Sequence, residues 1–226
     1  MARSIIVTGG FGVLGQAVAQ AFAAAGDKVA RIDFAPSPHS ALAGALDIGG
    51  IDLNDAAATQ AALDRVARAH GGLDVLVNVA GGFTWETLEG GSIDAWARMQ
   101  AMNLMSNATI TKLALPLLKA SAGGRIVNIG AGAAIKAGMG MGAYAASKSG
   151  VHRLTEALAE ELAGTSVTVN ALLPSILDTP ANRTDMPGAD TAQWVQPAAL
   201  AEVILFLASN AARAISGALI PVSRGG

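Results

Sequence analysis

The stretch Ile5-Ile6-Val7-Thr8-Gly9-Gly10-Phe11-Gly12-Val13-Leu14-Gly15 joins a short apolar run to a glycine-rich turn and the start of a helical segment. Its glycines match the Gly-x-Gly-x-x-Gly pattern of a turn that holds a dinucleotide between a strand and a helix. Glycine lets the backbone approach a pyrophosphate, and the helix N-terminus offers unpaired N–H groups to it. We therefore predict backbone contacts to a dinucleotide from Gly9, Gly10, Phe11, Gly12, Val13, Leu14 and Gly15.

Beyond this stretch, short apolar runs alternate with longer helical segments to the end of the chain. Further strands are predicted over 28–33, 45–48, 73–79, 125–129, 167–173 and 218–222. Helices are predicted over 13–25, 55–69, 92–119, 144–163 and 198–208. This alternation is typical of βαβ units. It predicts an α/β fold: a single Rossmann-type domain over 1–226, with a doubly wound parallel sheet of about seven strands and helices on both faces.

Composition excludes several classes of protein. The chain has 226 residues, 52% of them apolar and 14% charged, which suits one domain with a buried parallel sheet. The formal net charge is −2 with no basic block, so we expect no nucleic-acid partner. The chain has no cysteine, which excludes disulfides and thiolate catalysis, and its three scattered histidines predict no metal site.

The apolar segments are too short for a membrane span, which needs roughly 20 residues. The nearest candidate, 198–208, carries Glu202 and is predicted as a core helix. The first residues lack the apolar stretch of a signal peptide. We therefore expect no membrane partner and a cytoplasmic location.

The segment 177–197 differs from the rest of the chain. It contains Pro180, Pro187, Pro197 and Trp194 and shows no periodic pattern. A connection of this length in a compact domain is often a lid or binding loop. We predict that 177–197 is an irregular substrate loop.

Asp33 ends the second predicted strand, about 20 residues beyond the glycines, where a carboxylate can bind the 2′-OH of the adenosine ribose. A carboxylate there would repel a 2′-phosphate, so NAD is the expected cofactor, with NADH favoured over NADPH. Arg31 shares the same side of the strand and is the one feature that argues for NADPH.

Tyr144 and Lys148 are four residues apart near the start of a helix, so both lie on one face. An ammonium group close to a phenol favours the phenolate and lowers the tyrosine pKa. We therefore predict that Tyr144 is a general acid and that Lys148 tunes it.

With these motifs the sequence resembles the short-chain dehydrogenases/reductases over nearly its whole length. The resemblance implies that Asn103 supports a proton-relay water and completes the catalytic set with Tyr144 and Lys148. It also implies that Thr179 holds the nicotinamide amide. Further cofactor contacts implied by the resemblance come from Asp52, Leu53, Asn78, Ala80, Gly81, Lys148 and Pro174.

Two positions depart from the family pattern. Gly12 stands one residue before the expected second glycine, whose place is taken by Val13. The catalytic serine expected 13 residues before Tyr144 is Ala131, and the segment 122–143 contains no Ser, Thr or Tyr. A missing oxyanion donor of this kind costs about 10²- to 10³-fold in rate, so ordinary ketone reduction is expected to be slow unless Ser175 substitutes.

A narrower resemblance, to the dihydropteridine reductases, accounts for both departures. The segments 80–82, 150–154 and 173–190 are similar to that group, which also has alanine at the serine position. The implied substrate is quinonoid dihydropterin, although this chain differs from that group in having Asn78 and Asn103. The small-molecule substrate pocket is predicted to include Trp85, Ala131, Met139, Met141, Ser175, Met186 and Trp194.

Two alternatives remain open. One is a general carbonyl or 3-oxoacyl thioester reductase that uses another hydroxyl group. The other is a binding module that senses NADH without turnover, against which the set of Tyr144, Lys148 and Asn103 argues. The alanine-rich helices 92–119 and 144–163 suggest a homodimer or homotetramer.

Overall fold

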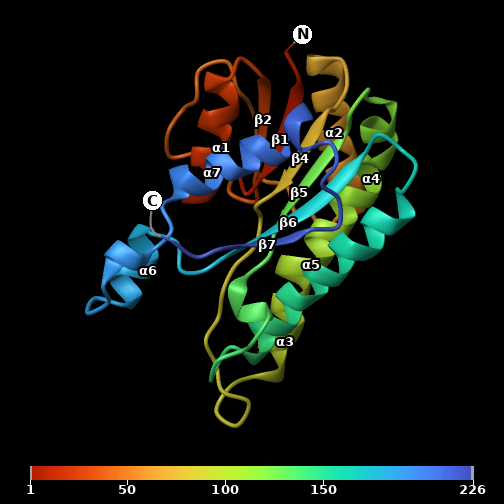
Figure 1. Cartoon of the computed structure of the whole chain (residues 1–226). Helices are drawn as coiled ribbons and strands as arrows, with labels where there is room; N and C mark the ends of the chain where they lie inside the picture. Colours follow the sequence, from red (N-terminus) through yellow and green to blue (C-terminus); the bar gives the residue numbers. More distant parts are fainter. Residues whose placement is uncertain (1, 225–226) are drawn as a thin grey trace.

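The computed structural model describes residues 2–224 and contains a sheet of seven parallel strands with helices on both faces (Figure 1). Met1, Gly225 and Gly226, which the predicted domain includes, lie outside the described residues. The strands are β1 (Ser4–Thr8), β2 (Lys28–Ile32), β3 (Leu46–Ile48), β4 (Val75–Asn78), β5 (Arg125–Ile129), β6 (Thr168–Pro174) and β7 (Leu219–Val222). They follow one another in the order β3-β2-β1-β4-β5-β6-β7, which confirms the predicted doubly wound α/β fold.

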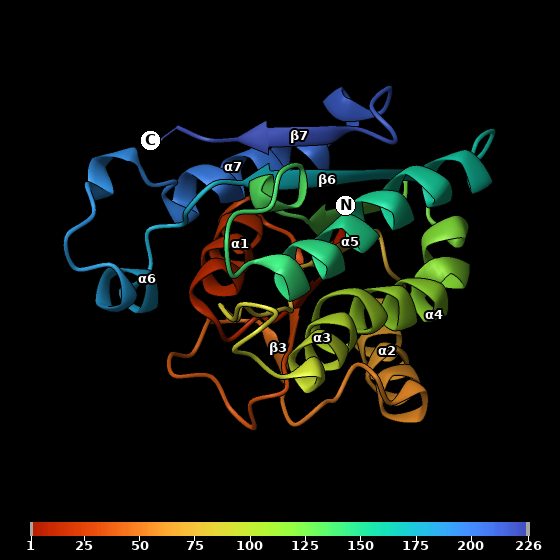
Figure 2. The same cartoon turned by 90° about the horizontal axis from the view of Figure 1, so that it is seen from below.

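Seven α-helices and four short helical segments connect the strands. The helices are α1 (Val13–Ala24), α2 (Ala56–His70), α3 (Ile93–Met99), α4 (Ser106–Ala120), α5 (Gly142–Glu161), α6 (Pro180–Asp185) and α7 (Pro197–Leu207). The short segments are a π-helix at Gln100–Met105 and 3-10 turns at Gly132–Ala134, Thr191–Gln193 and Asn210–Ala212. Figure 2 shows α1 and α7 on one side of the sheet and α2, α4 and α5 on the other.

The alternation of side chains along the strands explains these two layers. Ile5 and Val7 of β1 belong to the apolar core under α1 and α7, whereas Ile6 belongs to the core under α2, α4 and α5. All three are fully buried, as expected for a parallel sheet that is covered on both faces.

The strand order places a reversal beside β1, because the chain continues to β2 on one side and to β4 on the other. In sheets of this kind, ligands bind beyond the carboxyl ends of the strands at such a reversal. Thr8 ends β1, and the predicted site residues Asn78 and Ala80 lie at or just after the end of β4.

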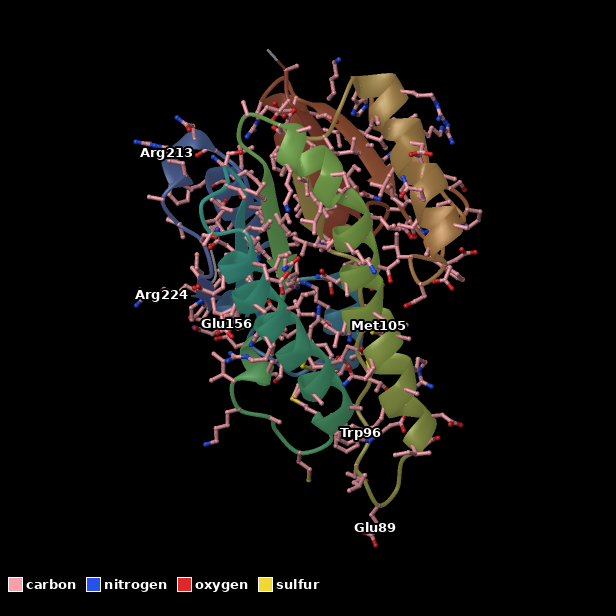
Figure 3. The ribbon with its side chains drawn as sticks, turned by 90° about the vertical axis from the view of Figure 1, so that its right-hand side faces the viewer. Glu89, Trp96, Met105, Glu156, Arg213 and Arg224 are labelled. Atoms are coloured by element: carbon pink, nitrogen blue, oxygen red, sulfur yellow. The ribbon has the colours of Figure 1, made fainter. Side chains whose placement is uncertain are left out.

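Two predicted elements differ from the structure. The expected single helix over 92–119 contains a π-helical turn at Gln100–Met105, although its two halves run on as one rod beside α5 (Figure 3). A π-helical turn leaves no mark in apolar periodicity, and such turns occur frequently at functional sites. The segment 177–197 was predicted to be irregular, yet it contains α6, whose first turn accepts Pro180 because proline needs no N–H partner there.

Candidate functional site

The glycine turn lies directly against the end of β4. Gly9 has φ of +61°, and a Cβ atom there would come within 2.9 Å of the backbone of Ala80. Only glycine allows both this conformation and this approach. Thr8 fixes the same contact, because its Oγ1 accepts hydrogen bonds from the backbone N–H groups of Val79 and Ala80, each at 3.1 Å.

The first turn of α1 is open to an anion. Its N-cap is Gly12, which has no side chain to accept a helix N–H, and Val13 is 46% exposed. Leu14 and Gly15 are buried. A helix of this length with an uncapped N-terminus fits the pyrophosphate that the sequence predicts there.

Asp33 anchors the glycine turn from the neighbouring strand. Its two carboxylate oxygens accept hydrogen bonds from the backbone N–H groups of Phe11 and Ala35, both at 2.9 Å. Arg31 is 1% exposed and forms a two-pronged ion pair with Asp47, at 2.7 and 2.8 Å. The guanidinium that argued for NADPH is therefore buried and already paired.

Asp52 and Leu53 follow β3 beside this turn. Leu53 is buried, whereas Asp52 is exposed and accepts hydrogen bonds from the backbone and side chain of Asn54. The backbone N–H of Ile51 bonds to the carbonyl of Asp33 at 3.0 Å, which holds this segment next to the end of β2.

Lys148 is held on the inner face of α5. It is 5% exposed, and its Nζ donates a hydrogen bond of 2.8 Å to the carbonyl of Ile129, the last residue of β5. Burial lowers the pKa of Lys148 to about 8, because the charged form loses solvation.

Tyr144 lies one helical turn before Lys148, in a largely apolar setting. Burial raises the pKa of its phenol to about 12. The prediction of a lowered tyrosine pKa was therefore wrong for the protein on its own. Loss of solvation by the phenolate outweighs any attraction to Lys148, whose ammonium bonds to Ile129.

Asn103 connects the segment after β4 to α5. Its side chain exchanges two hydrogen bonds with the backbone of Gly82, at 2.9 and 3.1 Å, and donates a third to Ser147 Oγ at 3.0 Å. Ser147 in turn donates to the carbonyl of Tyr144. A Cβ atom on Gly81 would lie 2.5 Å from Asn103 Oδ1 and 3.4 Å from Lys148 Nζ, so the structure brings Gly81, Asn103 and Lys148 together.

Asn78 has a different environment from the other predicted cofactor residues. Its Nδ2 donates to Asn107, Thr111 and Asn128 in a buried cluster between β4, α4 and β5. Its Oδ1 is buried without a hydrogen-bond partner among the described residues. The side chain is thus engaged inside the protein.

The predicted pocket residues divide by exposure. Trp85 and Met139 are 54% and 79% exposed, Met141 and Met186 are half-buried, and Ser175 is exposed. Ala131 and Trp194 are each 3% exposed. The indole of Trp85 lies against Gly140, and the Glu86 N–H bonds to the Gly140 carbonyl at 2.9 Å.

Phe83 is a site residue that the sequence interpretation missed. Its ring meets Tyr144 edge to face, with centroids 4.9 Å apart at an interplanar angle of 79°, and it is 53% exposed. The sequence signal that could have identified Phe83 is its position directly after Ala80-Gly81-Gly82. His152 was also missed: it accepts the backbone N–H of Ala131 at 3.3 Å.

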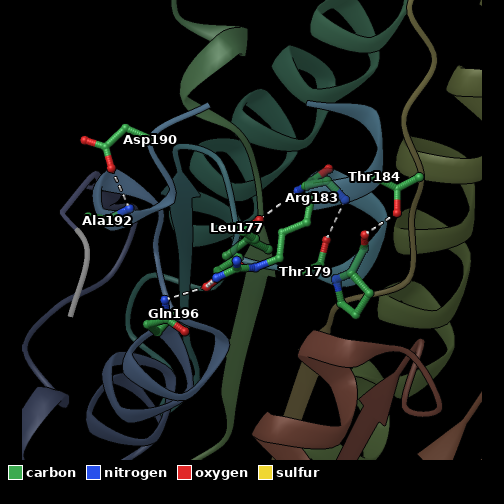
Figure 4. Close-up of polar contacts among 10 residues, drawn as sticks. Leu177, Thr179, Arg183, Thr184, Asp190, Ala192 and Gln196 are labelled. Carbon is green, nitrogen blue, oxygen red and sulfur yellow. Dashed lines mark hydrogen bonds and ion pairs between the residues drawn. The ribbon is translucent and has the colours of Figure 1, made fainter. Parts of the chain in front are cut away.

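Hydrogen bonds connect residues within the segment 177–196, which includes Thr179 (Figure 4). Thr179 Oγ1 caps α6 by accepting the Asn182 N–H. Arg183 and Gln196 both bond to Asp178, and the hydrogen bonds from Arg183 hold the pKa of that carboxyl at about 2. Pro174, in contrast, is the buried last residue of β6.

Among residues 2–224, no three His, Asp or Glu side chains come together as metal ligands. In the same part of the chain, no helix has the length and apolar character needed to cross a membrane.

Comparisons with known proteins agree on one family. Residues 3–189 match the sequence model of the short chain dehydrogenase family. D-threitol dehydrogenase of Mycolicibacterium smegmatis is 34% identical over 97% of this chain and 91% of its own. A 3-oxoacyl-[acyl-carrier-protein] reductase of Thermotoga maritima is 28% identical over 97% of this chain and 96% of its own. The ligand-free aldohexose dehydrogenase of Thermoplasma acidophilum superposes with a TM-score of 0.90 at 28% identity, covering 98% of this chain and 92% of that one.

Proposed function

The chain belongs to the short-chain dehydrogenase family, and from this premise we propose that it transfers hydride between a bound nicotinamide cofactor and a small electrophilic substrate. The observation that carries the proposal is the meeting of Lys148 and Asn103 at Gly81, with Tyr144 one helical turn before Lys148 and linked to Asn103 through Ser147. These groups stand at the carboxyl edge of the sheet, beside the glycine turn.

The residues at this edge fit a dinucleotide. The open N-terminus of α1 would bind the pyrophosphate, and Asp33 the adenosine ribose, with Asp52 and Leu53 near the adenine. On the other side of the turn, the nicotinamide end would contact Ala80, Gly81, Lys148, Pro174 and Thr179. Asn78 would contact it through its backbone, because its side chain bonds within the protein. NADH is favoured over NADPH, because Asp33 would repel a 2′-phosphate and Arg31 is committed to Asp47.

Side chains of this protein would carry out the proton transfer. The cofactor, when bound, supplies the hydride. The high pKa of Tyr144 keeps its phenol protonated at neutral pH, so the hydroxyl is ready to donate to the substrate atom that gains negative charge. The Lys148 ammonium would then stabilise the phenolate left behind, and Asn103 holds the segment after β4 against α5 while the proton is replaced from water.

The substrate we favour is a quinonoid dihydropterin. Ala131 offers no hydroxyl to polarise a carbonyl, and an electron-poor quinonoid ring needs less polarisation than a ketone. Two half-exposed aromatic side chains offer flat surfaces for a planar ring: Phe83, which packs on Tyr144, and Trp85, which lies against Gly140. Ala131, Met139, Met141, Ser175, Met186 and Trp194 are the other proposed pocket residues.

A general carbonyl or 3-oxoacyl thioester reductase is the second candidate. It is favoured by the relative named as a 3-oxoacyl-[acyl-carrier-protein] reductase. Its oxyanion donor would be Ser175, which is exposed just after β6. For either substrate class we propose one domain over 1–226. We also propose that the segment 177–197 closes over the substrate, and that the hydrogen bonds of Arg183 and Gln196 to Asp178 hold the two ends of this segment together.

We also propose a homodimer or homotetramer in the cytoplasm. The half-exposed Met102 and Met105 on the rod that α3 and α4 form would be covered by another copy of the chain. Light scattering coupled to size-exclusion chromatography measures the state directly, and a monomer at micromolar concentration would contradict this assembly.

The deciding experiment is steady-state turnover with quinonoid dihydropterin, a panel of ketones and 3-oxoacyl thioesters, each with NADH and NADPH. Fast NADH-dependent reduction of the pterin, with poor ketone turnover, supports the favoured substrate. Efficient ketone or thioester reduction would replace it with the second candidate. A protein that binds NADH tightly but turns over none of these substrates would support an NADH sensor.

A further inference from the structure

A cavity of about 390 Å³ lies between the 3-10 turn Gly132–Ala134, the middle of α5, the end of β6 and the start of β7. Its lining residues are Ala134, Ile135, Ser149, His152, Arg153, Leu173 and Leu219. Neither Tyr144 nor Lys148 is among them, and none has a role in the proposed reaction. The cavity therefore needs a separate explanation.

His152 is the buried polar group of this cavity. Its side chain is 3% exposed, and Gly130 leaves the space that the ring occupies, because a Cβ there would lie 2.5 Å from Nε2. Nε2 accepts the Ala131 N–H, so the neutral ring carries its proton on Nδ1. Burial, followed by repulsion from Arg153 and Lys148, lowers the pKa of His152, while Glu156 acts against this shift.

No hydrogen bond joins the Nδ1–H group to an acceptor among residues 2–224, and this nitrogen is not enclosed by protein in the way that the unpartnered Asn78 Oδ1 is. The donor is therefore accessible from the cavity, where a bound acceptor would gain a directed hydrogen bond. The ring therefore offers one directed donor to an occupant of the cavity that it lines.

Arg153 brings positive charge to the same cavity. It pairs with Glu156 at 2.8 Å, but the two side chains are 70% and 37% exposed, so the pair is weak and easily rearranged. Glu156 projects from the surface of α5 in Figure 3. The other lining residues are Leu173 and Leu219 on the sheet side, Ala134 and Ile135 on the turn side, and Ser149, whose Oγ already donates to the carbonyl of Ala134.

We infer that this cavity binds a small aliphatic monocarboxylate. One carboxylate oxygen accepts the His152 Nδ1–H, the negative charge lies near Arg153, and the chain packs against Leu173 and Leu219. A single charge matches one neutral donor and one cation, and apolar walls disfavour a dianion such as phosphate.

Calorimetric titration of the full chain with hexanoate tests the inference without cofactor or turnover, so the result is independent of the proposed function. We expect one site per chain with a Kd of about 1 mM or lower, and binding at least about tenfold weaker for hexanamide, which lacks the charge. Undetectable hexanoate binding, or equal binding of the two probes, would overturn the inference.

Two variants locate the site. Leu219→Trp fills the cavity and should abolish binding, and Arg153→Gln should weaken it about fivefold. Arg65→Gln makes the same charge change on the exposed surface of α2 and should leave it unchanged. Should Leu219→Trp not fold, long-range ¹H–¹⁵N spectra of the parent chain replace it: hexanoate must shift the His152 Nδ1 resonance, and an unmoved resonance rejects the site.

Discussion

The two halves of the site are built in different ways. On the cofactor side, Thr8 and Asp33 each accept two backbone hydrogen bonds, and Gly9 touches Ala80, so the turn is fixed before any ligand binds. On the substrate side, Phe83 and Trp85 leave about half of their surface exposed. The fixed polar turn on the cofactor side would act in the same way for every substrate. The open apolar surface on the substrate side would determine which substrate reacts.

The largest expected effect separates chemistry from binding. Tyr144→Phe removes the proposed proton donor but keeps the ring that packs on Phe83, so kcat/KM should fall about 10³-fold. The Kd for NADH, measured by fluorescence titration, should stay within about twofold, because the lost hydroxyl belongs to the substrate half. Retention of more than a tenth of the activity would show that another group delivers the proton.

The rigidity of the cofactor half is tested by two matched glycines. Gly9 and Gly26 both have positive φ, but a Cβ would meet Ala80 at position 9 and nothing within 4 Å at position 26. Gly9→Ala should weaken NADH binding about 30-fold and should destabilise the protein by about 2 kcal/mol more than Gly26→Ala does.

Urea unfolding and NADH titration of both glycine variants give the comparison. Equal stability losses would mean that the turn yields and that the contact with Ala80 is not a constraint.

The sequence predicted the cofactor half better than the substrate half, for a physical reason. Glycine spacing and strand–helix alternation are local signals, and they specify β1, the turn and α1 directly. Asp33 was found in the same way, from its distance beyond the glycines. The buried pairing of Arg31 with Asp47 was not, because it depends on β2 and β3 lying side by side.

The substrate half is formed by segments that are distant in the chain. Phe83 meets Tyr144, and His152 meets Ala131, only after β4, β5 and α5 have packed together. The raised pKa of Tyr144 has the same origin, since burial is a property of the whole fold. Local propensity also missed α6, which begins with Pro180 and ends just before Pro187.

A smaller effect tests the charge in the cofactor half. Asp33→Asn keeps the shape and one acceptor but removes the negative charge that would face a 2′-phosphate. The ratio of kcat/KM for NADH to that for NADPH should fall about tenfold, mostly through a lower KM for NADPH. Arg31→Lys is not a useful control because Arg31 is buried against Asp47, so Asp64→Asn, which makes the same charge change on the exposed surface of α2, is used instead. An unchanged ratio in Asp33→Asn would remove Asp33 from cofactor selection.

The smallest expected effect on activity concerns Lys148, which lies between the cofactor half and the substrate half of the site. Its pKa of about 8 lies below the ordinary value of 10.5, so the ammonium is lost on raising the pH through 8. If that charge stabilises the Tyr144 phenolate, kcat/KM for reduction should fall about fourfold between pH 7 and pH 8.5. Lys148→Arg carries a charge that does not titrate in this range, so its activity, although lower, should lose this alkaline fall.

The same shift has a definite sign for stability. The unfolded chain holds the Lys148 proton up to about pH 10.5 and the folded chain only up to about pH 8, so this residue makes stability rise with pH between those values. Tyr144 acts oppositely, because its raised pKa contributes stability below pH 10 that is lost as pH rises toward 12. Urea unfolding at pH 7.5 and 9.5 should therefore show a smaller gain with pH in Lys148→Met than in the parent chain. An equal gain in both would show that Lys148 keeps an ordinary pKa, and the alkaline fall in activity would then belong to another group.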